Sequence, residues 1–189
     1  VLTEEVLGAA FDANAVVSRH PVTGSVYVTA LPEGRRSDSE NQSGRVHVVG
    51  GGGTAARYLY VLDAAGFEVT AGALNEGDTD AEAARSLALD VVTVDPFAGV
   101  DSEAREAVEA RVEAADCVLV ADVEVGTGNL PNLRAATNAD SVVLVEDRPF
   151  AERNYVGTAA AQVYDALRAR GRVVDSSEVP AAVAAAVDP

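Results

Sequence analysis

Two patterns of apolar positions alternate along most of this 189-residue chain. Short apolar runs rich in Val are each followed by a stretch whose apolar positions recur at helical spacing. Strands of a parallel sheet are buried on both faces, so continuous apolar runs are typical of them. Six runs predict strands: Arg45–Val49, Phe67–Leu74, Asp90–Val94, Asp116–Ala121, Ser141–Val145 and Arg172–Asp175.

Helical patterns lie between these runs. The first places Leu59 and Leu62 on a buried face with Ala55 and Ala65, and Thr79 and Glu82 have the spacing of a capping box for the second. Further helices are predicted by Ala104, Val108, Val112 and Ala115, by Asn132–Ala139, by Val163, Tyr164 and Leu167, and by an Ala-rich stretch from Ser177 towards Val187. Repeated β-α units imply right-handed crossovers. We therefore predict an α/β fold, a three-layer, doubly wound, mainly parallel six-stranded Rossmann-like sheet with strand order 3-2-1-4-5-6.

The start of the chain has a different organisation. Val1–Pro32 predicts a short helix capped by Thr3, then a hairpin of Ala15–Ser18 and Val26–Thr29 around Pro21–Gly24. The polar stretch Leu31–Gly44 is typical of a linker. The predicted division is residues 1–32, a linker at 33–44 and a Rossmann-like domain at 45–189. The first unit is too small to carry its own core, so we expect it to pack on another part of a longer protein.

A glycine-rich turn follows the first strand of the predicted sheet. Gly50, Gly52 and Ala55 fit the G-x-G-x-x-G/A spacing of dinucleotide-binding folds. Glycines allow a sharp turn and a close backbone approach, and the following helix start offers N–H groups to an anion. Many α/β domains nevertheless open with a glycine turn and bind no nucleotide. The candidate ligand-binding residues here are Gly50, Gly51, Gly52, Gly53 and Thr54.

Polar residues also follow the other strands, at the edge where ligands of doubly wound sheets bind. Asp, Asn and Gly belong in turns in any case, and turn and capping chemistry explains most of these residues. Gly126–Asn129 is richer in glycine than a simple connection requires. The further candidate ligand-binding residues are Asn75, Glu76, Asp95, Asp122, Gly126, Gly128, Asn129, Glu146, Arg153 and Thr158.

The sequence offers no recognisable catalytic set. Glu76 is the acid nearest to the position that binds ribose hydroxyls in NAD sites, but Asp78 and Asp80 follow it and would repel a dinucleotide phosphate. The absence of Lys excludes a P-loop and a Tyr-x-x-x-Lys pair. Neither a Ser-His-Asp set nor a D-x-D-x-D-G metal loop is present. We predict no catalytic and no metal-binding residues in this chain.

Charge is the most unusual aspect of the composition. All 14 basic residues counted as Lys or Arg are Arg, against 30 acidic residues, and the formal net charge is -16. Such self-repulsion destabilises a compact state in dilute buffer. At molar salt the Debye length falls to about 3 Å, which screens most of the repulsion. The composition is typical of a cytoplasmic protein of an extreme halophile, although an ordinary acidic protein is the alternative.

We expect the melting temperature to rise between low salt and molar KCl, because screening removes repulsion that the folded chain concentrates. Thermal unfolding followed by circular dichroism across a KCl series measures this effect. A melting temperature that does not change with salt would contradict the prediction.

The same negative charge disfavours some classes of binding partner, nucleic acids first among them. A chain this acidic has no basic stripe to neutralise phosphates, so nucleic-acid binding is not expected. No apolar run approaches the roughly 20 residues of a membrane span. Cys117 lies in an apolar run and is expected in the core, and His47, within the first strand of the predicted sheet, is expected to be structural rather than catalytic. The other histidine, His20, lies far from it in sequence.

The first 32 residues resemble the C-terminal end of ATP-binding subunits of ABC importers, in the branch for iron siderophores and cobalamin. The likeness rests on a helix entry, an aromatic residue and a "HP-TG" motif between two strands: Val1-Leu2-Thr3-Glu5, Phe11, His20-Pro21-Thr23-Gly24 and Val26–Leu31. The remainder is similar to the extension of halophilic archaeal cobalamin-import subunits. That likeness is carried by VVGGGGTAARYL, GALNEGDTD and ERNYVGTAAAQVY.

The resemblance implies a longer parent, an ABC-type ATPase that uses ATP and Mg²⁺ upstream of this chain. It implies transmembrane permease subunits as partners, a homodimer as a further possibility, and a cytoplasmic location at the inner face of the membrane. The motifs for ATP hydrolysis would lie upstream, so no catalytic residue carries over. Three hypotheses follow: an accessory domain that senses a nucleotide or corrinoid, an NAD(P)-type nucleotide-binding enzyme domain, and a structural or dimerisation module.

Overall fold

The computed structural model describes residues 15–19, 26–30, 44–96 and 98–188. The chain divides into two compact units, Val1–Asn41 and Gln42–Pro189. In the first unit, β1 (Ala15–Arg19) pairs with β2 (Val26–Ala30) in antiparallel register, as the two predicted hairpin strands require. The helix predicted at Thr3, the turn at Pro21–Gly24 and most of the predicted linker lie outside the described residues.

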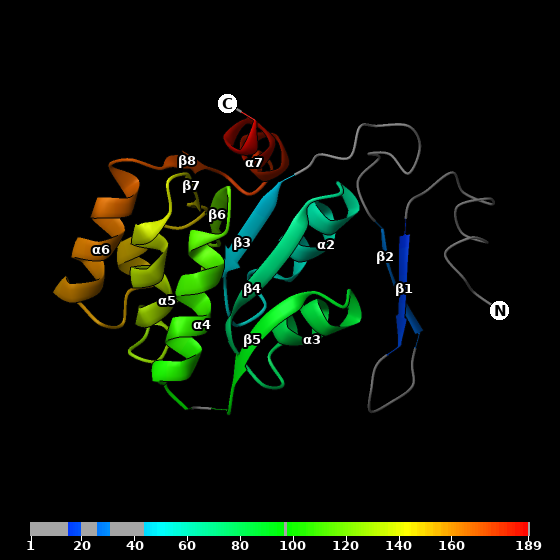
Figure 1. Ribbon diagram of the computed structural model, residues 1–189, viewed down its shortest axis with the longest axis horizontal. Helices are drawn as coiled ribbons and strands as arrows, with labels where there is room; N and C mark the ends of the chain where they lie inside the picture. The colour runs from blue at the N-terminus through cyan, green and yellow to red at the C-terminus, as the bar shows by residue number, and fades with distance from the viewer. Residues whose placement is uncertain (1–14, 20–25, 31–43, 97, 189) are drawn as a thin grey trace. The chain divides into compact units, whose positions relative to one another are not determined.

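The second unit is built on one six-stranded sheet. All its strands are parallel, in the spatial order β5-β4-β3-β6-β7-β8, which is the predicted order 3-2-1-4-5-6 (Figure 1). The α/β class and the doubly wound topology are therefore confirmed. The strands are β3 (Arg45–Val49), β4 (Glu68–Asn75), β5 (Asp90–Val94), β6 (Cys117–Val120), β7 (Val142–Val145) and β8 (Arg172–Val174).

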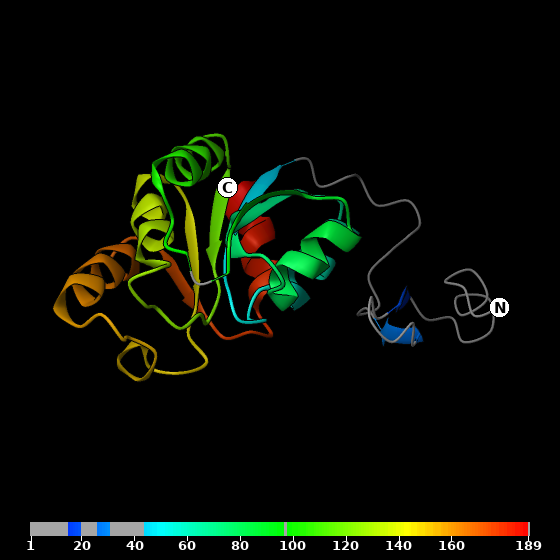
Figure 2. The same cartoon turned by 90° about the horizontal axis from the view of Figure 1, so that it is seen from below.

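Helices cover both faces of the sheet and complete three layers (Figure 2). Successive residues of a strand point to opposite faces, so Val48 packs in the core with α2, α3 and α7 while Val49 packs in the core with α4, α5 and α6. The helices of the first face are α2 (Ala56–Ala64), α3 (Thr79–Ser86) and α7 (Val179–Val187). Those of the second face are α4 (Ser102–Glu113), α5 (Leu130–Ala135) and α6 (Thr158–Arg168), with short 3₁₀ turns at Ala136–Asn138 and Phe150–Glu152.

Some local predictions were wrong. Helix α3 begins at Thr79, so Thr79 is not its cap. Asp78 is the cap, with extended backbone and a carboxylate that accepts the Asp80 N–H at 3.0 Å. Ala65 is exposed because α2 ends before it, and the fourth helix begins at Leu130, earlier than predicted.

The chain changes direction after β5. It builds outward from β3 through β4 to β5, then returns through α4 to place β6 on the other side of β3. The loops that follow β3 and β6 therefore lead to opposite faces of the sheet, and a crevice opens between them at this topological switch point. This is the position at which ligands of doubly wound sheets bind.

Asn132 of α5 fixes the backbone of β4 near this crevice. Its buried carboxamide accepts the Ala73 N–H at 3.0 Å and donates to the Ala73 carbonyl at 2.9 Å. The register between β4 and β5 shifts between Ala71 and Leu74, which leaves backbone groups without ladder partners. Asn132 satisfies them, since buried backbone polar groups need partners.

His47 lies on β3 and is fully buried, as expected of a structural histidine. Its Nδ1 contacts the Thr70 hydroxyl at 2.8 Å, and Nε2 has no partner among the described residues. Burial lowers the pKa of His47 to about 4. The folded state therefore holds the ring neutral at pH values where the unfolded chain takes up a proton.

This difference predicts a pH dependence of stability. The stabilisation is present above the ordinary histidine pKa of about 6.5 and is lost as the pH falls towards 4, because the unfolded chain binds more protons there. We expect His47→Asn to reduce the loss of unfolding free energy between pH 7 and pH 4 by roughly 3 kcal/mol. Urea unfolding at both pH values measures it, and identical pH profiles for the two proteins would contradict it.

Two further findings concern Cys117 and the length and polarity of the helices. Cys117 is buried, and burial raises the pKa of its thiol to about 11, which agrees with its predicted place in the core. Within the described residues, every helix is too short or too polar to cross a bilayer.

Candidate functional site: a closed glycine loop beside an open pocket

The glycine loop connects β3 to α2 and is tightly packed at its first residue. A Cβ on Gly50 would collide with the Ala55 side chain, and Gly52 has a φ of 67°, in the left-handed region that glycine adopts without strain. The Thr54 hydroxyl donates to the Gly51 carbonyl at 2.9 Å, which closes the turn. The sequence pattern thus gives the tight turn that it predicted.

The carboxylate of Asp80 occupies the inner side of this loop. Asp80 is fully buried, and one of its oxygens accepts the Gly51 N–H at 2.8 Å. The other accepts the Ala56 N–H at 2.7 Å, and the Ala55 N–H lies 3.1 Å from both. Burial raises the pKa of this carboxyl, and the hydrogen bonds from Ala55 and Ala56 oppose that shift.

A second carboxylate occupies the outer side. Asp78 accepts the Gly52 N–H at 2.7 Å while its other oxygen caps α3. Together, Asp78 and Asp80 bind four of the N–H groups that a glycine loop and helix start offer to an anion in dinucleotide-binding folds. The loop is therefore closed by two acids of this same chain.

The loop after β6 forms the facing side of the crevice. The Asn129 side chain accepts the Gly126 N–H at 2.8 Å and donates to the Glu124 carbonyl at 2.8 Å, which folds Glu124–Asn129 into a compact turn. Among the described residues, none apart from the adjacent ones in the chain lies within 4 Å of the position a Cβ would take on Gly126 or Gly128. The space beside these two glycines is therefore open.

The loop after β7 is joined to this turn. Val125 donates to the Arg153 carbonyl at 2.7 Å and accepts the Tyr155 N–H at 2.9 Å, so the two loops form a short ladder. Asn154 closes the end of its loop by accepting the N–H groups of Val156 and Gly157. Tyr155 is thereby held on a fixed backbone while its side chain is 68% exposed.

Arg148 and Arg153, both in the loop after β7 that carries Tyr155, bind Asp122 in the loop after β6. The guanidinium of Arg153 is fully buried and lies 2.9 Å from Asp122, and it donates to the Tyr164 hydroxyl at 2.8 Å. The Phe150 and Tyr164 rings stack with centroids 3.9 Å apart, and Arg153 lies about 5 Å from each centroid. Arg148, which is half-exposed, lies 2.7 Å from the other Asp122 oxygen and 3.5 Å from Glu124.

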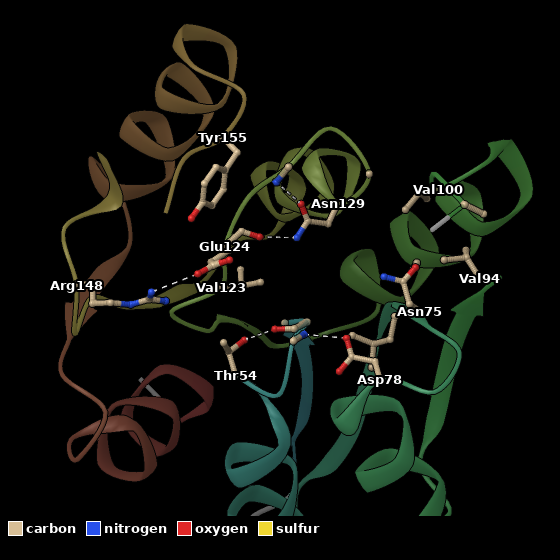
Figure 3. Close-up of a pocket in the computed structure, with 18 residues that line it drawn as sticks. Thr54, Asn75, Asp78, Val94, Val100, Val123, Glu124, Asn129, Arg148 and Tyr155 are labelled. Carbon is tan, nitrogen blue, oxygen red and sulfur yellow. Dashed lines mark hydrogen bonds and ion pairs between the residues drawn. The ribbon is translucent and has the colours of Figure 1, made fainter. Parts of the chain in front are cut away.

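A pocket of about 650 Å³ opens between these loops (Figure 3). Arg148 and Tyr155 lie on one side of it, and Asn75, Val94 and Val100 lie on the other. The lining combines glycine backbone, polar side chains and aliphatic ones: Gly50, Gly51, Gly52, Thr54, Ala73, Leu74, Asn75, Asp78, Val94, Ala98, Val100, Val123, Glu124, Gly126, Gly128, Asn129, Arg148 and Tyr155.

The structure brings eight of the predicted ligand-binding residues to this pocket: Gly50, Gly51, Gly52, Thr54, Asn75, Gly126, Gly128 and Asn129. Seven others do not line it: Gly53, Glu76, Asp95, Asp122, Glu146, Arg153 and Thr158. Asp122 and Arg153 pair below the loops, Glu76 lies 3.7 Å from Arg85, and Glu146 lies 3.2 Å from Arg168. Asp95 is exposed beyond β5, and Thr158 begins α6.

Several lining residues were absent from the predicted site. Asp78, Glu124, Arg148 and Tyr155 supply most of its charge and its aromatic surface. Each follows a strand end or lies in the ERNYVG stretch, so their position at the sheet edge was a usable signal. The residues that these four side chains contact in the folded chain could not be predicted from the sequence. Among the described residues, no group of three or more His, Cys, Asp or Glu is placed to hold a metal ion.

These features define an α/β domain of Rossmann-like topology with a closed glycine loop and a pocket at its switch point. Residues 69–180 match the MJ0874 family, and the chain belongs to that family. Two curated relatives, from Halobacterium salinarum strains R1 and NRC-1, are each named cobalamin import ATP-binding protein BtuD.

Each BtuD relative is 43% identical over 121 residues, which covers 64% of this chain and 30% of the relative. The chain therefore matches less than a third of their length. A solved structure described as AtPrR2 in apo form aligns with 70% of this chain and 48% of its own, at 16% identity and a TM-score of 0.44.

Proposed function

We propose that this chain is the C-terminal part of an ABC importer's ATP-binding subunit, and that its α/β unit is an accessory domain. In this proposal the domain binds a small cytoplasmic ligand in the switch-point pocket and thereby regulates transport. The similarity to the two cobalamin import ATP-binding proteins supports the transporter setting. The transported molecule would be cobalamin or an iron chelate.

The single observation that carries the ligand-binding role is the pocket itself. It lies at the switch point where doubly wound sheets bind ligands, and its volume of about 650 Å³ is in the range of small-molecule sites. Its aliphatic side comes from β4, β5 and the loop after β5, and its polar side from the loops after β3, β4, β6 and β7. An open pocket with both kinds of surface suits recognition of a small organic molecule.

The remaining parts of the proposal follow from the parent. ATP and Mg²⁺ would bind upstream of this chain, permease subunits would be the membrane partners, and the subunit would act at the cytoplasmic face as one of a pair. The fragment itself would not hydrolyse ATP, since it has no Lys for a P-loop. The closed glycine loop speaks against the NAD(P)-type enzyme alternative, because a dinucleotide phosphate would meet Asp78 and Asp80.

The full-length subunit, assembled with its permease in vesicles, tests the regulatory role. Gly126→Leu would place a large side chain at the pocket lining, where no non-adjacent residue of the described chain lies within 4 Å of a Cβ. Ala159→Leu adds the same side chain at an exposed site on α6 and serves as the matched control. We expect ATP hydrolysis or substrate uptake to change in the first variant and not in the second.

Equal rates of ATP hydrolysis and uptake in the wild type and both variants, with and without added corrinoid or iron chelate, would contradict regulation through the pocket. That result would favour the structural or dimerisation module instead.

A further inference from the structure

We propose that the switch-point pocket selects a phosphate-free small molecule with a planar, largely apolar body and hydrogen-bond donors, and rejects phosphorylated ligands. This inference names the ligand class of the proposed sensing function and rests on it for its biological setting. The binding preference itself is a property of the described residues, and four features of the pocket carry it.

The first feature is the occupation of the anion-binding groups. Asp80 accepts N–H groups of Gly51, Ala55 and Ala56, and Asp78 accepts that of Gly52. Asp80 is fully buried, so a ligand cannot displace it without opening the loop. The carboxylates stand where the phosphate of a bound dinucleotide would lie, and they would repel a second anion at close range.

The second feature is the balance of charge in the lining. Asp78 and Glu124 are acids, and Arg148 is the cation among the described residues that line the pocket. Arg148 is already paired with Asp122 at 2.7 Å and lies 3.5 Å from Glu124. The one cation of the described lining is therefore already shared between two carboxylates, and the two acids of the lining outnumber it. Their oxygens can accept hydrogen bonds from a ligand.

The third feature is the shape of the surfaces. Tyr155 presents an aromatic ring that is 68% exposed from the fixed ladder with Val125. The aliphatic side chains of Val94 and Val100 lie across the pocket from it (Figure 3). Glycine backbone at Gly126 and Gly128 leaves the space between them open. A planar ring system can stack on Tyr155 and contact the aliphatic side at the same time.

Asn75 adds a polar group with unused capacity. Its carboxamide lies on the aliphatic side of the pocket, and no partner is found for it among the described residues. It can accept from an amino or imino group of a ligand or donate to a ring carbonyl. Acceptors on both sides of an apolar gap favour a ligand that carries donors at the edges of its ring.

Matched probe pairs test the inference with the 189-residue chain in KCl. Adenosine against 5′-AMP and riboflavin against FMN each differ by one phosphate on the same body. Isothermal titration is expected to give a dissociation constant at least tenfold lower for the phosphate-free member of at least one pair. Tighter or equal binding of the phosphorylated members, or no binding of any probe at millimolar concentration, would overturn the inference.

Variants of Asp78 locate the cause. Asp78→Asn keeps an acceptor for the α3 cap but removes the charge, and Asp78→Ala also frees the Gly52 N–H. Both are expected to shrink the preference severalfold by raising affinity for AMP or FMN, while Asp95→Asn, an exposed acid outside the lining, leaves it unchanged. An unchanged preference in both Asp78 variants would overturn the role assigned to that carboxylate.

These outcomes are separable from failure of the proposed function. If the phosphate-free members bind as expected but transport is indifferent to Gly126→Leu, the regulatory role fails and the ligand class stands. If transport responds to Gly126→Leu but phosphorylated probes bind better, the ligand class fails and the regulatory role stands.

Discussion

Replacement of Asp80 by Ala is expected to lower the free energy of unfolding by about 3–5 kcal/mol, because it removes a buried charge that several donors share. The carboxylate accepts N–H groups of Gly51, Ala55 and Ala56. Without it, these groups lose their partner at a helix start that has no other side-chain cap. Urea or guanidinium unfolding in molar KCl measures the difference.

Two variants bracket this effect. Asp80→Asn keeps one acceptor oxygen and the shape of the side chain, so its loss of stability should be smaller than that of the Ala variant. Asp95→Ala removes an exposed acid near the same sheet edge and should change the free energy of unfolding by no more than about 0.5 kcal/mol. An Asp80→Ala variant as stable as Asp95→Ala would contradict the structural role of Asp80 in the glycine loop.

Arg153→Ala is expected to cost a similar amount, about 3–5 kcal/mol. Its guanidinium is fully buried against Asp122, the Tyr164 hydroxyl and the Val123 carbonyl. Truncation leaves the Val123 carbonyl and the Tyr164 hydroxyl without this donor, leaves Asp122 with Arg148 alone, and opens a space beside the stacked rings of Phe150 and Tyr164. The free energy of unfolding from denaturant titration is the measurement.

Arg148→Ala is the matched control for this prediction, because both arginines bind the carboxylate of Asp122. Arg148 is half-exposed, and exposed ion pairs contribute about 1 kcal/mol or less. A clear difference between the two variants is therefore expected. Equal losses would contradict the assignment of Arg153 as the buried anchor of the loop that carries Tyr155.

The fold was predictable because its signal is local and repeated. Each buried parallel strand is a continuous apolar run, so β3 and β5 were predicted to the residue, and the strand order followed from the glycine turn after the first strand of the sheet. Helix ends were less predictable, since Thr79 and Asp78 are both good caps by type. Only the folded backbone shows that Asp78 is the residue with extended geometry at that end.

The site was predictable in position but not in chemistry. Residues at strand ends meet at one sheet edge in any doubly wound fold, which brought Asn75, Gly126 and Asn129 to the pocket. From the sequence, Asp78 and Asp80 were predicted only as acids after Glu76 that would repel a dinucleotide phosphate. That they bind N–H groups of the glycine loop depends on how the loop after β4 folds against the loop after β3, which sequence spacing does not encode.

Arg153 is another residue whose place at the sheet edge was predictable but whose contacts were not. Arg153 was predicted as a ligand-binding candidate because it lies beyond the fifth strand of the predicted sheet, at the edge where ligands of doubly wound sheets bind. In the folded chain Arg153 is instead fully buried and donates to the Tyr164 hydroxyl. It stabilises the loop that carries Tyr155 and does not line the pocket. Its position in the ERNYVG stretch predicted that it lies near the ligand-binding edge of the sheet, but not that its side chain is buried.

A thermal-shift screen of the chain in molar KCl tests whether the switch-point pocket binds a small ligand. Corrinoids, nucleosides, nucleotides and dinucleotides are each compared in the wild type, Gly126→Leu and Ala159→Leu. A ligand at a hundredfold excess over its Kd adds about 2.7 kcal/mol of stability. We expect a phosphate-free ligand to raise the melting temperature of the wild type and of Ala159→Leu but not of Gly126→Leu. No shift with any ligand, or the same shift in all three proteins, would contradict it.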